Sequence, residues 1–148
     1  SVGYLYYGLD SIGDTQELFV TAGYDTVLNP SVTIYYDFDE GDGAFFVLSL
    51  GHSVAVSDSV SLGADLSINA GYANPIMGLN QTGNTVDGLY SGVLLVSSSI
   101  DASKNISVEP MLGYSLPLSQ DADDAISSLS MNKKSSHLFG GVSLTLLF

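Results

Sequence analysis

The stretch VSLGADLSINAGY, residues 60–72, alternates between apolar and small or polar side chains along its whole length. Its even-numbered positions carry the apolar side chains, and its odd-numbered positions carry serine, glycine, aspartate and asparagine. Because successive side chains of a β-strand point to opposite faces, this period of two predicts a strand with one apolar and one polar face.

The rest of the chain repeats this pattern between clusters of glycine, proline, serine, asparagine and aspartate that favour turns. The more apolar face falls on even-numbered positions throughout, least clearly in the sixth segment, where Leu89, Val93 and Leu95 are odd. A weak helical pattern occurs at residues 122–129. The predicted strands are residues 2–9, 16–27, 31–39, 44–56, 60–73, 88–102, 106–119 and 137–148.

The composition of the 148-residue chain is unusual for a water-soluble domain. Charged residues make up 13%, about half the usual share, and the mean hydropathy is +0.30. No apolar run approaches the roughly 18 residues of a transmembrane helix. Apolarity spread over alternate positions instead predicts an all-β protein, an antiparallel up-and-down transmembrane β-barrel with eight strands in one domain, residues 1–148.

The net charge of −13 comes from 16 acidic residues against three lysines. Nucleic acid is therefore excluded as a partner, since too few cations are present to neutralise phosphates. The absence of cysteine excludes disulfides and thiolate metal sites. No signal peptide is recognisable at Ser1, so we expect that a leader has been removed or that strands precede this sequence in a longer chain.

Seven acidic residues fall within the predicted strands, all on the polar face. A soluble barrel would carry long charged side chains outside, whereas serine, glycine and threonine dominate here. We therefore place these acids in the interior, facing the lumen. They are Glu17, Asp25, Asp37, Asp39, Asp65, Asp101 and Glu109.

Unpaired carboxylates are costly to bury. The lumen is therefore expected to be wet and cation-preferring, or the ring has more than eight strands, or some carboxylates are protonated or capped by a cationic partner. Inward-facing aromatic residues offer the alternative of a plugged lumen. These are Tyr7, Phe19, Tyr35, Phe45 and Phe139.

Aromatic residues on the apolar face concentrate near the ends of the predicted strands. Tyr36, Phe38, Phe46, Tyr72, Tyr90 and Tyr114 lie towards one set of ends, and Tyr4, Tyr24 and Phe148 towards the other. Two such belts predict the aromatic girdles of a transmembrane barrel. The alternative is that these residues are ordinary strand formers that pack against their neighbours.

The predicted connections alternate in length. They are residues 11–15, 28–30, 40–43, 57–59, 74–87, 103–105 and 120–136. Short turns on one side and longer loops on the other are typical of outer-membrane barrels, in which the short turns are periplasmic. An even strand number then places both termini on the periplasmic side.

The last twelve residues, HLFGGVSLTLLF, resemble the terminal strand of Gram-negative outer-membrane β-barrel proteins, which commonly end on phenylalanine. Leu144, Leu146 and Phe148 match that pattern, although no earlier tyrosine or tryptophan is present. The resemblance implies recognition by the outer-membrane assembly machinery, contact with outer-membrane lipid, and a size like that of the small eight-stranded barrels. The stretch NPSVTIYYDFDEGDG, residues 29–43, is similar to segments of uncharacterised, longer proteobacterial outer-membrane proteins, which implies a larger barrel.

Two acidic stretches are candidates for cation binding. DFDEGDG, residues 37–43, fails as an EF-hand, because the sixth and twelfth positions hold Asp42 and Leu48 rather than glycine and glutamate. It predicts instead a hairpin tip in which Gly41, Asp42 and Gly43 have positive φ. Asp121, Asp123 and Asp124 leave open weak cation binding in the last loop.

The two histidines do not form a catalytic arrangement. His52 and Ser53 are adjacent in a strand and point to opposite faces. His137 follows a loop, and no carboxylate lies at a spacing in the sequence that would orient its imidazole for catalysis. We expect no catalytic residue, no bound metal and no cofactor. The lipid-facing position of His52 would be explained by the headgroup region or by contact with another chain.

The leading functional prediction is a porin-like or pore-lining barrel with an acidic, cation-preferring lumen. The first alternative is a structural or adhesive barrel, or a subunit of an envelope complex, acting through loops 74–87 and 120–136. The second is a soluble, lipocalin-like ligand-binding barrel. A homo-oligomer and an envelope protein partner are both compatible with the sequence.

Overall fold

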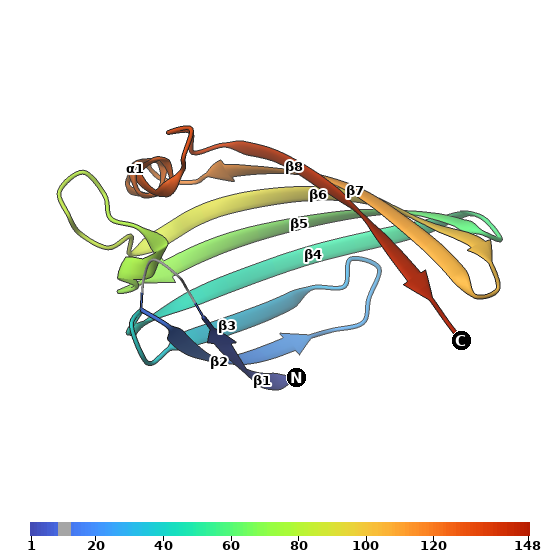
Figure 1. Ribbon diagram of the computed structural model, residues 1–148, viewed down its shortest axis with the longest axis horizontal. Coiled ribbons are helices and arrows are strands. Elements are labelled where there is room, and N and C mark those ends of the chain that lie inside the picture. The colour runs from blue at the N-terminus through green and yellow to red at the C-terminus, as the bar shows by residue number, and fades with distance from the viewer. Residues whose placement is uncertain (9–12) are drawn as a thin grey trace.

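The computed structural model describes residues 1–8 and 13–148 and contains one antiparallel sheet in which each strand pairs with the next along the chain (Figure 1). This arrangement confirms the predicted all-β, eight-stranded up-and-down order. The predicted strand end at residue 9 and the start of the 11–15 connection lie outside the described residues. The strands are β1 (Val2–Tyr7), β2 (Thr15–Gly23), β3 (Ser31–Asp37), β4 (Gly43–Ser57), β5 (Val60–Tyr72), β6 (Gly88–Ser103), β7 (Ile106–Pro117) and β8 (His137–Leu146).

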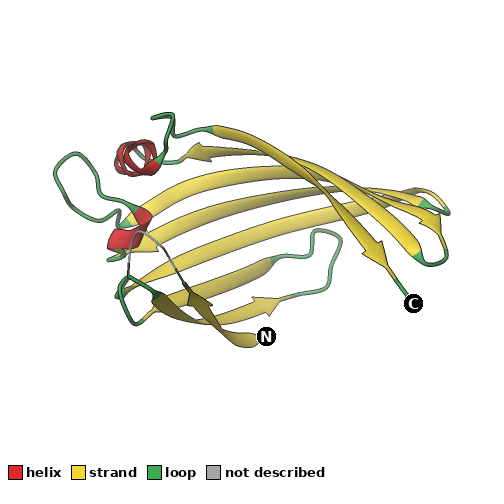
Figure 2. Cartoon of the chain, in the orientation of Figure 1, coloured by secondary structure: helices red, strands yellow, loops and turns green. Residues whose placement is uncertain are grey.

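The sheet curls into a trough rather than a closed ring (Figure 2). Within the described residues, β1 and β8 pair only with β2 and β7, respectively. No helix in this part of the chain is long and apolar enough to cross a membrane.

The connections at the two ends of the sheet differ in length. Residues 38–42, 73–87 and 118–136 lie at one end, which we call the loop end. Residues 24–30, 58–59 and 104–105 lie at the other, the turn end, together with both termini (Figure 1). The predicted asymmetry is present except at the 24–30 connection, which is longer than the predicted turn at 28–30 and also longer than the 38–42 connection at the loop end.

Several predicted strands extend too far, and in the second and third strands this moves four predicted site residues into loops. β2 ends at Gly23, so Tyr24 and Asp25 lie in the following loop. This loop continues beside β4, where the Gly51 N–H donates to the Leu28 carbonyl at 2.8 Å. β3 ends at Asp37, so Phe38 and Asp39 lie in the β3–β4 turn.

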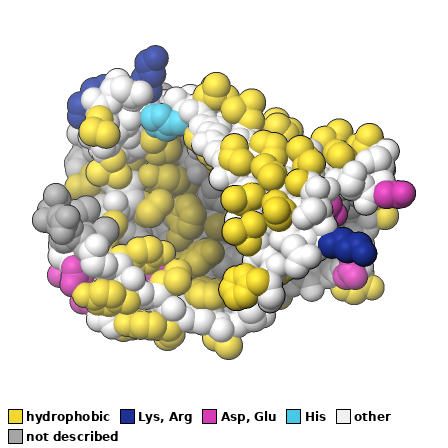
Figure 3. Space-filling model, turned by 45° about the vertical axis from the view of Figure 1, so that its right-hand side comes forward, with side chains coloured by type: hydrophobic (Ala, Val, Ile, Leu, Met, Phe, Trp, Pro, Cys, Tyr) yellow, Lys and Arg dark blue, Asp and Glu magenta, His cyan; other side chains and the backbone are white. Residues whose placement is uncertain are grey.

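The two faces of the sheet differ as the alternation predicted. Even-numbered apolar side chains on the convex face are exposed, including Leu18, Val20, Leu48, Leu66 and Leu94. Odd-numbered positions line the concave face, where serine and glycine recur. Figure 3 shows hydrophobic side chains over the outer surface and a hollow beside them.

A β-bulge in β6 reverses the predicted orientation of Tyr90. Asn69 pairs with Ser91, whereas Ala70 pairs with Leu89, so Tyr90 is an extra residue between two ladder pairs. Leu89 therefore faces outward with 53% exposure, and Tyr90 faces inward with 7%. The assignment of Tyr90 to the outer aromatic belt is wrong for this reason. The weak alternation of the sixth predicted strand was the sequence feature that indicated this bulge.

The buried apolar side chains of the described residues gather at the loop end. Val86, Tyr90, Ala122 and Ala125 form this cluster, which we call the cap. Phe45, Met77 and Ile126 pack against it. Two short helices supply cap residues, η1 (Pro75–Met77) and α1 (Gln120–Leu129), the latter longer than the predicted pattern at 122–129.

Candidate functional site

Five of the seven predicted interior acids lie on the concave face. Glu17 and Asp37 lie on β2 and β3, Asp65 on β5, Asp101 on β6, and Glu109 on β7. The other two do not join them: Asp25 is in an exposed loop, and Asp39 accepts a hydrogen bond at 2.8 Å from Gln16, which occupies an even, outward position. Lys104, Lys133 and Lys134 lie in turns and loops, so strand residues supply no lysine to neutralise these acids.

Asp37 holds the β3–β4 turn in place. Asp37 is only 2% exposed, and its carboxylate accepts from the Thr15 hydroxyl at 2.7 Å and from the Asp39 N–H at 3.0 Å. A Cβ atom at Gly41 would overlap this carboxylate. The hydrogen bonds compensate for removing the charge from water, so Asp37 is a structural carboxylate more than a lumen charge.

The turn after Asp37 has one of the three predicted positive φ angles, at Asp42 (36°). Glycine is required at positions 41 and 43 because a side chain there would overlap neighbouring atoms. A Cβ at Gly43 would lie 2.6 Å from the Ala73 carbonyl oxygen. The sequence therefore predicted the turn correctly but gave the wrong reason for its glycines.

Glu17 lies directly opposite Asp37 in the β2–β3 ladder. It accepts a hydrogen bond from the Tyr7 hydroxyl at 3.3 Å. Like charges on opposite strand positions repel each other, so this pair concentrates negative potential at the loop end of the concave face.

Asp65, Asp101 and Glu109 are exposed on the concave face, towards the turn end. The carboxylate of Asp65 lies over Gly51, where a Cβ atom would overlap it. A cavity of about 240 Å³ here is lined largely by small polar residues. Its lining is Asn29, Ser31, Ser49, Gly51, His52, Ser53, Gly63, Asp65 and Ser97. Such a surface keeps carboxylates hydrated.

Inward-facing aromatic rings lie against the wall of the trough. Cβ atoms at Gly3 and Gly113 would overlap the rings of Phe19 and Phe139, respectively. Phe19 also contacts Tyr35, with ring centroids 5.7 Å apart. Aromatic rings that cover glycines stabilise neighbouring strands, and here they leave the middle of the trough open.

Phe45 differs from these rings because it packs into the cap. It meets Tyr90 edge-on, with centroids 5.8 Å apart, and the Tyr90 hydroxyl donates to the Met77 carbonyl at 2.6 Å. The cap therefore extends from the loops onto the concave face at the loop end. Sequence reasoning missed this role of Tyr90.

Hydrogen bonds join the β5–β6 loop to α1. Asn80 Nδ2 donates to Asp121 at 3.2 Å, and Gln81 Nε2 donates to Asp124 at 2.9 Å. Ser135 donates to Asp123. These three acids thus have local partners. No group of three histidine, aspartate or glutamate side chains in the described residues is arranged to hold a metal.

Asn69 is a buried polar residue that the sequence did not single out. Its Nδ2 donates to the Ser91 hydroxyl at 2.9 Å. Its Oδ1 is buried and has no hydrogen-bond partner among the described residues. A bound water is the usual partner for such an acceptor.

His52 lies on the convex face, as predicted, and its surroundings come from its own chain. Its Nδ1 is 2.6 Å from the Val27 carbonyl oxygen in the 24–30 loop. An N–H at this ring nitrogen donates to the loop carbonyl. This contact supplies a structural reason for a polar residue on the apolar face, without a second chain or a headgroup.

The remaining predicted belt residues lie on exposed positions. Tyr4, Tyr36, Phe46, Tyr72 and Tyr114 are on the convex face of strands, and Tyr24 and Phe38 are in exposed connections. The predicted assembly residues Leu144 and Leu146 are exposed on β8. Phe148 lies two residues beyond the strand end and is also exposed.

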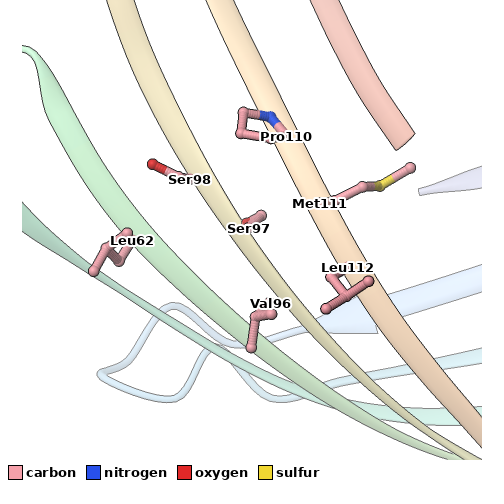
Figure 4. A pocket seen from close by; sticks show the side chains of 7 residues that line it. All are labelled: Leu62, Val96, Ser97, Ser98, Pro110, Met111 and Leu112. Carbon is pink, nitrogen blue, oxygen red and sulfur yellow. The ribbon is translucent and has the colours of Figure 1, made fainter. Parts of the chain in front are cut away.

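The convex face carries an open groove of about 340 Å³ across β5, β6 and β7 (Figure 4). Proline has no N–H to donate, and the β6–β7 pairing is interrupted at Pro110, between the pairs Ser97–Met111 and Ile100–Val108. Ser98 is small and lies between larger side chains. The groove residues are Leu62, Val96, Ser97, Ser98, Pro110, Met111 and Leu112.

No family model matches the chain, and no curated protein matches it. The functional argument therefore depends on the two faces of the sheet and on the cap.

Proposed function

We propose that this chain forms the wall of a transmembrane β-barrel of the bacterial outer membrane, with a concave face that lines a water-filled, cation-preferring pore. The observation that carries the proposal is the distribution of side chains between the two faces, which is the reverse of that in a water-soluble barrel. Exposed apolar residues cover the convex face, whereas serine, glycine and carboxylates recur on the concave face. A sheet in lipid requires this arrangement.

Strand length supports the membrane assignment. β4, β5, β6 and β7 contain 15, 13, 16 and 12 residues. A tilted strand needs about 9–11 residues to cross the hydrocarbon core. The loop end would then be extracellular, and the turn end, with both termini, would be periplasmic.

The concave face supports cation preference. Asp65, Asp101 and Glu109 are exposed there. Carboxylates without cationic partners attract mobile cations and repel anions when they line a pore. The open cavity around Asp65 leaves room for water beside this carboxylate.

Conductance across a planar lipid bilayer tests this proposal. We expect discrete channels, with a reversal potential in a KCl gradient that indicates preference for K⁺ over Cl⁻. Asp65→Asn should lower this preference without abolishing conductance, whereas the neighbouring concave substitution Ser67→Asn should leave it unchanged. Protein that inserts but does not conduct would disprove the pore.

The ordered cap favours a second candidate, a structural or adhesive barrel that binds a partner through its loops. The contacts between α1 and the β5–β6 loop give these loops a defined surface. This candidate predicts insertion without conductance, and loss of partner binding when loops 74–87 or 120–136 are shortened. A lipocalin-like barrel fits less well, because its apolar face would be concave.

A further inference from the structure

Three aromatic side chains form a continuous row across the concave face towards the loop end. Phe19 of β2 pairs with Tyr35 of β3, and Tyr35 pairs with Phe45 of β4. Glycines bound the row, with Gly3 of β1 opposite Phe19 and Gly71 of β5 opposite Phe45. Because directly paired residues point to the same face, the three rings form one band, which we call the aromatic row.

The two ends of the aromatic row differ in accessibility. Phe45 packs into the cap, where it meets Tyr90 edge-on. Phe19 and Tyr35 are half-buried, and their rings are tilted by 37° with centroids 5.7 Å apart. Part of each of these two rings therefore remains accessible from the trough.

Glu17 is the carboxylate next to this accessible end. It lies two residues from Phe19 on the same face of β2, and diagonal to Tyr35, because its direct partner on β3 is Asp37. Diagonal neighbours are about 7–8 Å apart, within reach of aromatic side chains. Tyr7 is diagonal to Glu17 on β1, and its hydroxyl donates to the carboxylate at 3.3 Å. Three aromatic side chains from three strands thus adjoin one carboxylate.

The charge of Glu17 is less compensated than that of Asp37. Asp37 is buried and accepts a hydrogen bond from the Thr15 hydroxyl at 2.7 Å. Glu17 is half-buried, and within the described residues it accepts only the long bond from Tyr7. No lysine lies in a strand, and the chain contains no arginine. A carboxylate partly removed from water without a cationic partner favours a cationic ligand.

The other exposed carboxylates of the concave face lack neighbouring rings. Asp65 lies opposite Gly51 and Leu95, and Glu109 lies opposite Ser143. The combination of a carboxylate with several aromatic side chains therefore distinguishes Glu17 from Asp65 and Glu109.

This combination suits an organic ammonium ion. The faces of aromatic rings attract cations, and aromatic cages recognise quaternary ammonium groups. An inorganic cation such as Ca²⁺ needs several oxygen ligands, and no three histidine, aspartate or glutamate side chains in the described residues are arranged to hold a metal. A neutral solute would leave the charge of Glu17 uncompensated.

We infer that the concave face holds a binding site for organic ammonium ions, in which Glu17 compensates the charge and Tyr7, Phe19 and Tyr35 contact the alkyl groups. This inference rests on the proposed function, because solutes reach the concave face through a water-filled lumen. It names organic cations as a class of solute that this pore binds. The site lies at the loop end, so ammonium ions entering from outside the cell meet it first.

Choline binding tests the inference. The protein is refolded in octyl glucoside, which carries no choline headgroup, and is titrated by isothermal calorimetry. We expect saturable binding of choline and none of dimethylbutanol, its neutral carbon isostere. Glu17→Gln keeps the size of the side chain and should abolish the binding, whereas the matched loss of charge in Glu109→Gln should leave it unchanged.

Aromatic substitutions test the role of the rings. Tyr35→Leu should weaken choline binding about three- to tenfold, because one ring face is lost. Tyr35→Phe keeps the ring and should bind like the unsubstituted protein. Phe139→Leu is the control, since no carboxylate lies opposite or diagonal to Phe139 in the β7–β8 ladder. Circular dichroism checks the folding of each variant, and Glu17→Gln decides the test if Tyr35→Leu does not fold.

The outcomes separate this site from the proposed pore. Equal binding of dimethylbutanol, displacement of choline by an equal concentration of K⁺, or equal losses in Glu17→Gln and Glu109→Gln would overturn the site. A cation-preferring channel that shows no saturable choline binding would overturn the site and leave the pore intact. Choline binding by protein that inserts into bilayers without conducting would overturn the pore and retain the site.

Discussion

The cap and the wall of the trough are stabilised in different ways. In the cap, Ala122 and Ala125 of α1 are fully buried against Val86 and Tyr90, as in a water-soluble domain. In the wall, large apolar side chains such as Leu66 and Leu94 are exposed on the convex face. Burial in the cap comes from the chain itself, whereas burial of the wall requires an apolar surrounding medium. Substitutions in the two regions should therefore respond differently to lipid.

A charge on the convex wall should produce the largest effect. Leu66→Arg places a cation in the middle of β5 on the lipid side, where it costs about 2–4 kcal/mol near the bilayer midplane. We expect poor refolding into vesicles, measured by urea titration of the lipid-inserted protein.

The matched control is the neighbouring substitution Ser67→Arg, which places the same charge on the concave face. It should refold almost normally. Equal losses for Leu66→Arg and Ser67→Arg would contradict the lipid assignment of the convex face, since adjacent strand residues differ only in the side they face.

Removal of the hydroxyl that bonds to the buried carboxylate should have the next largest effect. Thr15→Val keeps the shape but leaves Asp37 without the donor at 2.7 Å. Hydrogen bonds to charged groups contribute about 1.5–3 kcal/mol. The midpoint of urea unfolding should fall accordingly, while Thr145→Val, at an exposed position of β8, should change it little. Equal midpoints for both variants would show that Asp37 does not depend on Thr15.

Overpacking the cap should have a similar or smaller effect, and one confined to the loop end. Ala125→Leu inserts a larger side chain at a fully buried position, which typically costs about 1–3 kcal/mol. A Cβ at Gly78 would lie 2.9 Å from the Ala125 carbonyl oxygen, so the adjacent loop has little room to move. Limited proteolysis of the β5–β6 loop should accelerate, with insertion into vesicles unchanged.

The exposed position Ser128 on the same helix provides the control for this change. Ser128→Leu should leave proteolysis of the loop near the unsubstituted rate. If Ala125→Leu also prevented insertion, the cap and the wall would form one cooperative unit, and the distinction between them would fail.

The sequence predicted the wall better than it predicted the ends. Period-two alternation is a local property, so residues such as Leu62, Leu66 and Asp65 were placed on the correct faces without knowledge of tertiary structure. The pairing of β4 with β5 and of β6 with β7 also followed from the short connections between them. The strand ends depended on contacts between distant segments, such as Gly51 with Leu28, which alternation does not encode.

The cap shows the same limit more clearly. Tyr90 fits the outer face by its even number, but the bulge moves it inward to meet Phe45 and Met77. Asp39 fails for a related reason, because the strand ends before it. Local patterns predict regular strands well, and these errors occur where tertiary packing interrupts that regularity.

The N-cap of α1 should give the smallest effect. The Ser119 hydroxyl accepts from the Ala122 N–H at 3.2 Å and donates to the Leu89 carbonyl at 2.8 Å. Ser119→Ala removes both bonds, and loss of an N-cap costs about 1 kcal/mol. Amide hydrogen exchange should accelerate in the first turn of α1 and remain unchanged in β5. Ser119→Asp restores the accepting role but cannot donate to Leu89, so it should recover most of the protection if capping dominates. If Ser119→Asp exchanges as fast as Ser119→Ala, the bond to the bulged strand β6 is the one that holds the helix against the wall.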